Sequence, residues 1–227
     1  MQIPLYEHPL WQNIPQQVMR PGGLTVTERA LAFCKLPPGA RLLDLGCGSG
    51  TTLRHLAAQA GLTGFGLDLS SALLGRAAAA GGAAFAQARG EQLPLAAASL
   101  DAILCECTLS IFEMEPALRE CARVLKPGGF FIVSDLYARC PSGIGALRSL
   151  PPATCIASAR TQAEIQALLA DCGLEISTWQ DCSQHLKDFP LCTLSAAAAV
   201  DPFDLIIAAG KAKLGYYFLV ARRIAER

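Results

Sequence analysis

A glycine-rich turn after a short apolar run is the stretch of the chain most suggestive of chemistry. In Leu42-Leu-Asp-Leu-Gly-Cys-Gly-Ser-Gly-Thr51, glycines occupy positions 46, 48 and 50. Glycine lets the backbone turn sharply and approach a ligand closely, and the helix expected after the turn offers free N–H groups. The turn has no Gly-Lys-Ser/Thr ending, which excludes a P-loop, and Thr51 stands where a dinucleotide fingerprint requires glycine. Asp44 would repel a pyrophosphate and attract a ligand that carries an amino group.

A second carboxylate, Asp68, ends the predicted strand in Gly64-Phe-Gly-Leu-Asp-Leu-Ser70, 18 residues beyond Gly50. An acid at this position can accept hydrogen bonds from the 2′- and 3′-hydroxyls of a ribose. The alternative is a structural role, in which Asp68 caps the helix that follows. The spacing favours a nucleoside site.

The chain has ten cysteines, two of which flank a carboxylate in the stretch ILCECTLS, residues 103–110. Their spacings contain no Cys-x-x-Cys and no zinc-type pairing of pairs, so we expect no metal site and mostly buried, reduced thiols. Cys105 and Cys107 alternate with Glu106 on a predicted strand, which predicts that both point to one face of the sheet. Cys105 is then a core residue. Cys107 lies where the strand opens, and it either lines a pocket passively or holds a substrate.

Alternating strands and helices predict an α/β fold, a doubly wound, seven-stranded and mostly parallel sheet with helices on both faces. Thr25 and Glu28 predict a capping box at the start of the first helix. Ligands of such sheets bind at the carboxyl ends of the strands, where the glycine turn, Asp68 and Cys107 all fall. The expected strands are 40–45, 63–69, 83–88, 99–107, 130–135, 174–179 and 216–222, and the expected helices are 25–34, 52–60, 72–80, 116–125 and 161–172. We expect a loop over 137–154.

Composition limits the classes of partner. Lys+Arg and Asp+Glu are both 19, and the chain has no basic run, so we expect no nucleic-acid partner. We see no signal peptide or membrane span, and therefore expect a cytoplasmic protein with no membrane partner. The length of 227 residues predicts a single domain, 1–227, that is a monomer or a homodimer. Within it we expect a cap segment (1–36), a cofactor-binding core (37–136) and a C-terminal half (137–227) with a helical insertion at about 184–214.

Five ordered motifs resemble those of the class I S-adenosylmethionine-dependent methyltransferases, most of all the branch that includes the ubiquinone and menaquinone methyltransferases. They are LLDLGCGSG, GLDLS, Gly90-Glu-Gln-Leu-Pro-Leu95, Ser99-Leu-Asp101 and Arg123-Val-Leu-Lys-Pro-Gly-Gly129. The resemblance implies a Rossmann-like fold, S-adenosylmethionine as the cofactor and methyl transfer to a small-molecule acceptor.

The same resemblance implies a set of cofactor-binding residues. Asp44 and Gly46 would meet the methionine end of the cofactor, Asp68 the ribose hydroxyls and Leu69 the adenine. The family often has an aspartate where this chain has Arg89, so the adenine contact is expected from the backbone around Gly90 and Glu91. The remaining residues of the expected cofactor site are Cys47, Gly48, Gly50 and Cys107.

A narrower resemblance concerns two cysteines. Cys107-Thr-Leu-Ser and Cys155-Ile-Ala-Ser-Ala159 are similar to the two cysteine-centred segments of arsenite methyltransferases. This similarity suggests a soft acceptor, such as a thiol, a selenol or arsenite, held near Cys107 and Cys155, because thiolates are the natural ligands of soft atoms.

Methyl transfer from a sulfonium is an in-line displacement with a good leaving group, so positioning can supply much of the rate. Cys107 and Tyr137 are expected at the strand ends beside the methyl group, and His8 is the histidine kept as a candidate base. Arg20 is a candidate for binding a carboxylate of the cofactor or the acceptor, and equally a solvated loop charge. A function of another class, a non-catalytic nucleoside-binding accessory protein, is suggested by Arg89 and by the lack of an obvious base.

Overall fold

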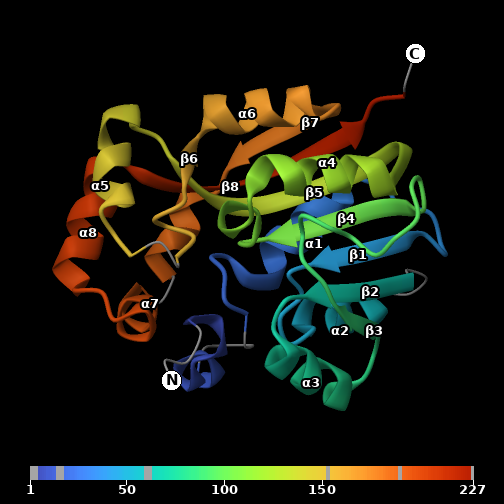
Figure 1. The fold of residues 1–227 in the computed structure, drawn as a ribbon, viewed down its shortest axis with the longest axis horizontal. Coiled ribbons are helices and arrows are strands. Elements are labelled where there is room, and N and C mark those ends of the chain that lie inside the picture. The colour runs from blue at the N-terminus through green and yellow to red at the C-terminus, as the bar shows by residue number, and fades with distance from the viewer. Residues whose placement is uncertain (1–4, 14–17, 59–62, 152–153, 189–190, 226–227) are drawn as a thin grey trace.

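The computed structural model of the chain describes residues 5–13, 18–58, 63–151, 154–188 and 191–225, and is built around one eight-stranded sheet. The strand order is β3-β2-β1-β4-β5-β8-β7, and β6 pairs with β5 beside this path. Only β8 runs antiparallel to its neighbours, β5 and β7. The strands are β1 (Arg41–Leu45), β2 (Thr63–Asp68), β3 (Ala84–Gln87), β4 (Leu100–Glu106), β5 (Leu125–Ala138), β6 (Arg160–Thr161), β7 (Leu174–Asp181) and β8 (Leu214–Arg223). The doubly wound, mostly parallel sheet predicted from the sequence is confirmed (Figure 1).

Helices cover both faces of the sheet, and each face has its own apolar core. Leu42 and Leu43 are neighbours on β1 and face opposite cores, as the alternation of side chains along a strand requires. One core includes side chains of α1 and α2, and the other includes side chains of α4 and α6. The main helices are α1 (Gly23–Ala32), α2 (Thr51–Ala58), α3 (Ser71–Ala80), α4 (Met114–Val124) and α6 (Gln162–Asp171).

The remaining helices include α5, α7 and α8, which gather at one end of the sheet. Figure 1 shows α5, α7, α8 and the N-terminal segment at the end toward which the arrows of β1 and β4 point, which is the carboxyl end of the parallel strands. These elements are η1 (Leu5–Glu7), η2 (Pro9–Asn13), η4 (Leu109–Ile111), η5 (Pro141–Gly143), α5 (Ile144–Arg148), η6 (Ser183–Asp188), α7 (Leu191–Ala198) and α8 (Pro202–Lys211). None of the helices in the described ranges is long and apolar enough to cross a membrane.

The structure differs from the sequence prediction in three local features. The two residues of β6 form an eighth strand, too short to leave a periodic signal. The helix α1 begins at Gly23 behind a left-handed N-cap, Gly22, so the predicted capping box is wrong, and Glu28 instead contacts His55 (2.7 Å). The expected loop 137–154 contains two short helices, η5 and α5. Pro141 can begin η5 because the first position of a helix tolerates proline.

Candidate active site

A cleft of about 500 Å³ opens at the carboxyl ends of β1, β2 and β4. Its volume lies in the range of roughly 300–1,000 Å³ that is usual for small-molecule sites. The glycine turn forms one side, the segment that follows β3 another, and the N-terminal segment contributes Tyr6, Glu7 and Val18. Of the residues predicted from the sequence, the cleft is lined by Arg20, Gly46, Cys47, Gly48, Asp68, Leu69, Gly90, Glu91 and Cys107.

The turn after β1 is held in place by its glycines and by Thr108. Gly46 has a φ of 79°, and a Cβ there would overlap the Thr108 side chain, whose hydroxyl donates to the carbonyl of Leu45 (2.9 Å). Gly48 also has a positive φ, 53°, but a Cβ there would meet only the end of Met19. Gly46 is therefore required by packing against β4, whereas Gly48 faces the cleft.

Asp68 is oriented by two backbone groups. The N–H of Gly48 donates to Asp68 Oδ2 and the N–H of Ser70 donates to Oδ1, both at 2.8 Å. A carboxylate offers about four acceptor positions, so acceptor capacity remains on the cleft side. Ser70, not Asp68, caps α3 by accepting from the N–H of Leu73 (3.1 Å). The capping alternative for Asp68 is therefore wrong, and this carboxylate is free to serve a ligand.

Apolar side chains stand beside Asp68. Leu69 is 59% exposed although it is large and hydrophobic. Phe112 lines the same cleft, and a Cβ on Gly90 would come within 3.1 Å of its ring, so Gly90 allows the two segments to pack. Leu69 and Phe112 give this end of the cleft the character of a site for a flat, apolar group.

Arg89 and Glu91 pair with each other in the segment that follows β3. Arg89 Nε lies 3.4 Å from Glu91 Oε2, and Glu91 Oε1 accepts from the N–H of Glu113 (3.0 Å). The Glu91 side chain is thereby committed to the start of α4. In this segment the backbone of residues 90 and 91 is then available to a ligand, and a contact between this backbone and the adenine remains an expectation from the sequence.

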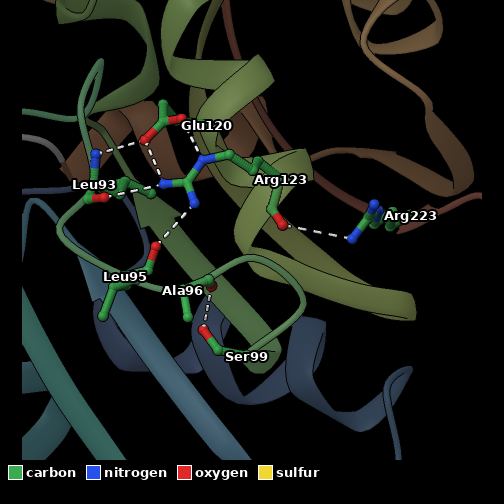
Figure 2. Close-up of polar contacts among 7 residues, drawn as sticks. All are labelled: Leu93, Leu95, Ala96, Ser99, Glu120, Arg123 and Arg223. Atoms are coloured by element: carbon green, nitrogen blue, oxygen red, sulfur yellow. Dashed lines mark hydrogen bonds and ion pairs between the residues drawn. The ribbon is translucent and has the colours of Figure 1, made fainter.

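The helix α4 clamps the loop that carries this segment (Figure 2). Arg123 donates to the carbonyls of Leu95 (2.9 Å) and Leu93 (3.0 Å), and Glu120 accepts from the N–H of Leu93 (2.7 Å). Arg123 and Glu120 also pair at 2.6 Å, and this pairing is the main reason that the pKa of Glu120 is lowered. Arg123 does not line the cleft. It fixes the loop that follows residues 88–91, which do line it.

A buried polar cluster contributes Arg20, Thr52 and Glu106 to the lining of the cleft. Arg20 Nη2 is 2.9 Å from Glu106 Oε2, and the two side chains are 9% and 5% exposed. The hydroxyls of Thr27 and Thr52 donate to Glu106 (2.6 and 3.1 Å), and Arg20 in turn donates to both hydroxyls (2.8 and 3.0 Å). Arg20 Nε is buried and has no hydrogen-bond partner among the described residues. Arg20 is therefore a fixed cation with a donor to spare, not a solvated loop charge.

Glu106, Thr27 and Thr52 were not predicted as site residues. Glu106 stands in the middle of ILCECTLS, and a carboxylate within a run of buried strand residues signals a partner. That partner, Arg20, is 86 positions away, so no local pattern connects the two. Phe112 was missed as well, because a single aromatic residue after a strand has no distinguishing signal.

Asp44 and Gly50 are brought near the site but do not line the cleft. Asp44 is 3% exposed, and burial, with a smaller contribution from the charge of Glu106, raises its pKa to about 8. The charge of Arg20 acts in the opposite direction. Gly50 packs under the turn, where a Cβ would come within 2.7 Å of the Phe85 ring. Asp44 is thus a buried residue of the strand before the turn, and Gly50 packs against β3.

Cys107 lies in the cleft just after β4, in a backbone conformation that is rare for a side-chain-bearing residue. Its φ is 55°, and such strain is concentrated at functional sites. Because of this turn, Cys107 packs in the core on the side of α1 and α2, whereas Cys105 packs in the opposite core. The prediction that the two cysteines share a face is therefore wrong. Cys105 is a core residue as predicted, with its Sγ 3.1 Å from Thr108 Oγ1.

Cys155 lies behind the cleft rather than in its wall. Its N–H donates to the hydroxyl of Tyr6 (3.3 Å), so η1 connects the cleft to this cysteine. Burial raises the pKa of Cys155 to about 12 and raises that of Cys107 as well. A negative charge on Cys155 would raise the pKa of Cys107 further, and the two cysteines pack in the same apolar core. Both thiols are protonated at neutral pH.

The structure does not bring Tyr137 or His8 to the cleft. The hydroxyl of Tyr137 donates to Asp181 on β7 (2.7 Å), and its ring packs edge-on against Trp179, so it belongs to the other side of the sheet. His8 Nδ1 accepts from the N–H of Leu10 (3.3 Å) in the turn between η1 and η2, while its neighbours Tyr6 and Glu7 face the cleft. Neither residue can act on a ligand bound there in this conformation. Within the described ranges, no group of three or more His, Cys, Asp or Glu side chains is arranged to hold a metal ion.

The fold is Rossmann-like, and comparison with known proteins shows the family to which the chain belongs. The methyltransferase domain family matches residues 43–133. An O-methyltransferase of Aspergillus sclerotiorum is 30% identical over 210 residues, which cover 82% of this chain and 76% of that protein. The chain therefore belongs to the class I S-adenosylmethionine-dependent methyltransferases, and its cofactor is S-adenosylmethionine.

Two further similarities are relevant to the substrate and the fold. An arsenite methyltransferase of Halobacterium salinarum is 29% identical over 171 residues, covering 70% of this chain and 44% of that protein. A crystal structure of geranyl diphosphate C-methyltransferase from Streptomyces coelicolor A3(2), in complex with S-adenosyl-L-homocysteine, superposes with a TM-score of 0.70. It shares 15% identity and covers 89% of this chain and 76% of that chain, a likeness that shows the fold alone.

Proposed function

We propose that the cleft holds S-adenosylmethionine with its adenine between Leu69 and Phe112, its ribose on Asp68 and its methionine end toward Arg20. The observation that carries this proposal is that one cleft is lined by apolar side chains, by a carboxylate that two backbone N–H groups orient, and by a buried cation with a spare donor. The spare Nε of Arg20 suits the cofactor carboxylate, and Glu106 beside it suits the amino group. The residues present therefore fit the cofactor.

We further propose that the enzyme methylates a small molecule next to Cys107. The bound cofactor supplies a methyl group on a sulfonium, which needs no further activation. The chain supplies position, through the fixed turn after β1, and effective concentration in this way can contribute about 7–11 kcal/mol to lowering the barrier. No histidine is among the described residues that line the cleft, so a general base in the wall is not part of the proposal.

Titration calorimetry with S-adenosylhomocysteine tests the cofactor site. We expect Asp68→Ala to weaken binding at least tenfold, because charge-assisted hydrogen bonds contribute about 1.5–3 kcal/mol each. Asp101→Ala is the matched control, since Asp101 binds Lys126 and the N–H of Arg41 at the opposite end of β4. Equal affinities of the wild type and Asp68→Ala for S-adenosylhomocysteine would reject the proposed ribose contact.

A soft nucleophile is a second candidate for the acceptor. It is favoured because Cys107 and Cys155, from segments far apart in the chain, pack in the same core, and because Tyr6, which lines the cleft with Cys107, accepts from the N–H of Cys155. Because both thiols are protonated at neutral pH, an arsenic atom would bind by displacing two thiol protons, as As(OH)₃ and two thiols give a dithiolate and two waters.

Release of S-adenosylhomocysteine in the presence of arsenite, a thiol and a selenol tests this candidate. We expect Cys107→Ser and Cys155→Ser to abolish turnover of arsenite. Cys34→Ser is the control, because Cys34 is as deeply buried as Cys155, at 4% exposure, but packs against Ala30 on α1. Undiminished turnover by both site variants would eliminate the soft acceptor and leave the methyltransferase proposal intact.

A further inference from the structure

A second pocket, of about 350 Å³, lies beside the cofactor cleft. Phe112 lines both cavities and forms the wall between them. Ser110 lines the second pocket, and its hydroxyl donates to the buried carboxylate of Asp135 (3.0 Å). Ser110 is three residues beyond Cys107, which lines the cofactor cleft, so the second pocket lies next to the part of the cleft in which the methyl group is expected.

Two arginines give this pocket its character. Arg148 donates to the carbonyls of Ala157 and Ala159, the latter at 2.8 Å, which fixes the guanidinium at the rim. The backbone of Arg160 belongs to β6 and pairs with β5, but its side chain forms no hydrogen bond or ion pair with any residue that the structure describes, although the residue is half-buried. Ser158 lines the pocket between them. A fixed guanidinium, a free guanidinium and the Ser158 hydroxyl form a surface that suits a planar or tetrahedral oxyanion, whereas the Ser110 hydroxyl already donates to Asp135.

Nearby carboxylates offset this charge only in part. Glu164 lies close enough to both arginines for their charges to lower its pKa, but its carboxylate already accepts from the N–H and the hydroxyl of Thr161 (2.7 and 2.8 Å). Asp135 is 1% exposed and accepts from the N–H and the hydroxyl of Ser110 and from the N–H of Leu136. Neither carboxylate forms an ion pair with Arg160, so its charge is available to a ligand.

We propose that this pocket binds an oxyanion of the methyl acceptor, a phosphate or a carboxylate group, while the part to be methylated reaches past Phe112 toward Cys107. The inference rests on the proposed function, since it assumes that the larger cleft holds the cofactor. The cofactor's own carboxylate has Arg20 in that cleft, so the Arg148 and Arg160 pair serves a different molecule. The acceptor class is therefore an anionic small molecule.

Titration of the wild-type protein with inorganic phosphate and, separately, with acetate tests the pocket, followed by NMR of the arginine Nε–H signals at constant ionic strength. We expect saturable shifts of the Arg160 signal and at least tenfold weaker binding by Arg160→Gln. Glu164→Gln keeps the hydrogen bonds at the start of α6 and removes one negative charge, so it is expected to bind the anion several-fold more tightly. Arg76→Gln, which removes an exposed charge on α3, is expected to leave the affinity unchanged.

The two arms also identify the anion. Tighter binding of phosphate indicates a phosphorylated acceptor, and tighter binding of acetate a carboxylic acid. The absence of saturable binding to the wild type, or an unchanged affinity in Arg160→Gln, overturns the proposal. Titration of the same samples with S-adenosylhomocysteine separates this failure from a failure of the cofactor site, because that affinity does not depend on Arg160.

Discussion

Replacing Arg20 with methionine is expected to destabilise the protein by leaving the Glu106 carboxylate buried without its cation. Arg20 contacts Glu106 and the hydroxyls of Thr27 and Thr52 at distances between 2.8 and 3.0 Å. The methionine side chain occupies a similar volume and makes none of these contacts. The perturbation therefore removes charge and hydrogen bonds with little change in packing.

The magnitude follows from burial. Breaking a buried ion pair by removing one partner costs about 3–5 kcal/mol, since the remaining charge stays out of water. Thr27 and Thr52 continue to donate to Glu106, which places the expected loss near the lower bound, about 3 kcal/mol. For a chain of this length, 1 kcal/mol corresponds to about 2–4 °C in Tm, so the expected decrease is about 6–12 °C.

Urea denaturation followed by circular dichroism measures this loss. The double variant Arg20→Met/Glu106→Gln is expected to recover at least half of it, because the uncompensated charge is gone. Arg119→Met is the control for the loss of an arginine, since its pair with Glu115 is more than half exposed and contributes about 0.2–1 kcal/mol. A loss below 1 kcal/mol in Arg20→Met, or a double variant no more stable than the single one, would refute the reasoning.

Three further predictions concern the supports of the site. Because burial raises the pKa of Asp44 to about 8, this group stabilises the fold below about pH 4 and the stabilisation is lost as the pH rises to 8. Urea denaturation at several pH values measures this. Between pH 4 and pH 8, the free energy of unfolding of the wild type is expected to decrease, relative to that of Asp44→Asn, by up to about 1.4 kcal/mol per pH unit. A constant difference between the two proteins over this range would contradict the prediction. Gly46→Ala is expected to lower the free energy of unfolding by about 1–3 kcal/mol more than Gly39→Ala. The two glycines have φ values of 79° and 80°, but a Cβ at Gly46 would overlap a side chain and a Cβ at Gly39 would not. Equal decreases in Tm would argue against packing as the cause. Arg123→Ala is expected to cost about 1–2 kcal/mol and to speed amide hydrogen exchange in residues 90–95, and unchanged exchange there would show that the clamp in Figure 2 does not hold the loop.

The sequence predicted the strands and the glycine turn because their signals are local. The apolar runs of the seven predicted strands match β1 to β5, β7 and β8. Asp68 ends β2, and it and the following residue, Leu69, line the cleft. Most of the predicted cofactor residues line one cleft, because adjacent parallel strands bring their carboxyl ends together, whereas Asp44 and Gly50 do not line it.

What the sequence did not predict depends on backbone turns and on contacts across the chain. The positive φ of Cys107 reverses the face expected from alternation along β4. Tyr137 lies within β5 with its side chain on the other face of the sheet, where its hydroxyl donates to Asp181 on β7. The pairing of Arg20 with Glu106 joins segments that only the folded chain brings together. Such features require the three-dimensional structure.

The most direct test of the account is a crystal structure of the protein with S-adenosylhomocysteine. We expect the ribose hydroxyls within hydrogen-bond distance of the Asp68 carboxylate, the adenine against Leu69 and Phe112, and the sulfur beside Cys107. A ligand bound outside this cleft, or one with its adenine at Arg20 and its amino acid end at Leu69, would contradict the proposed site.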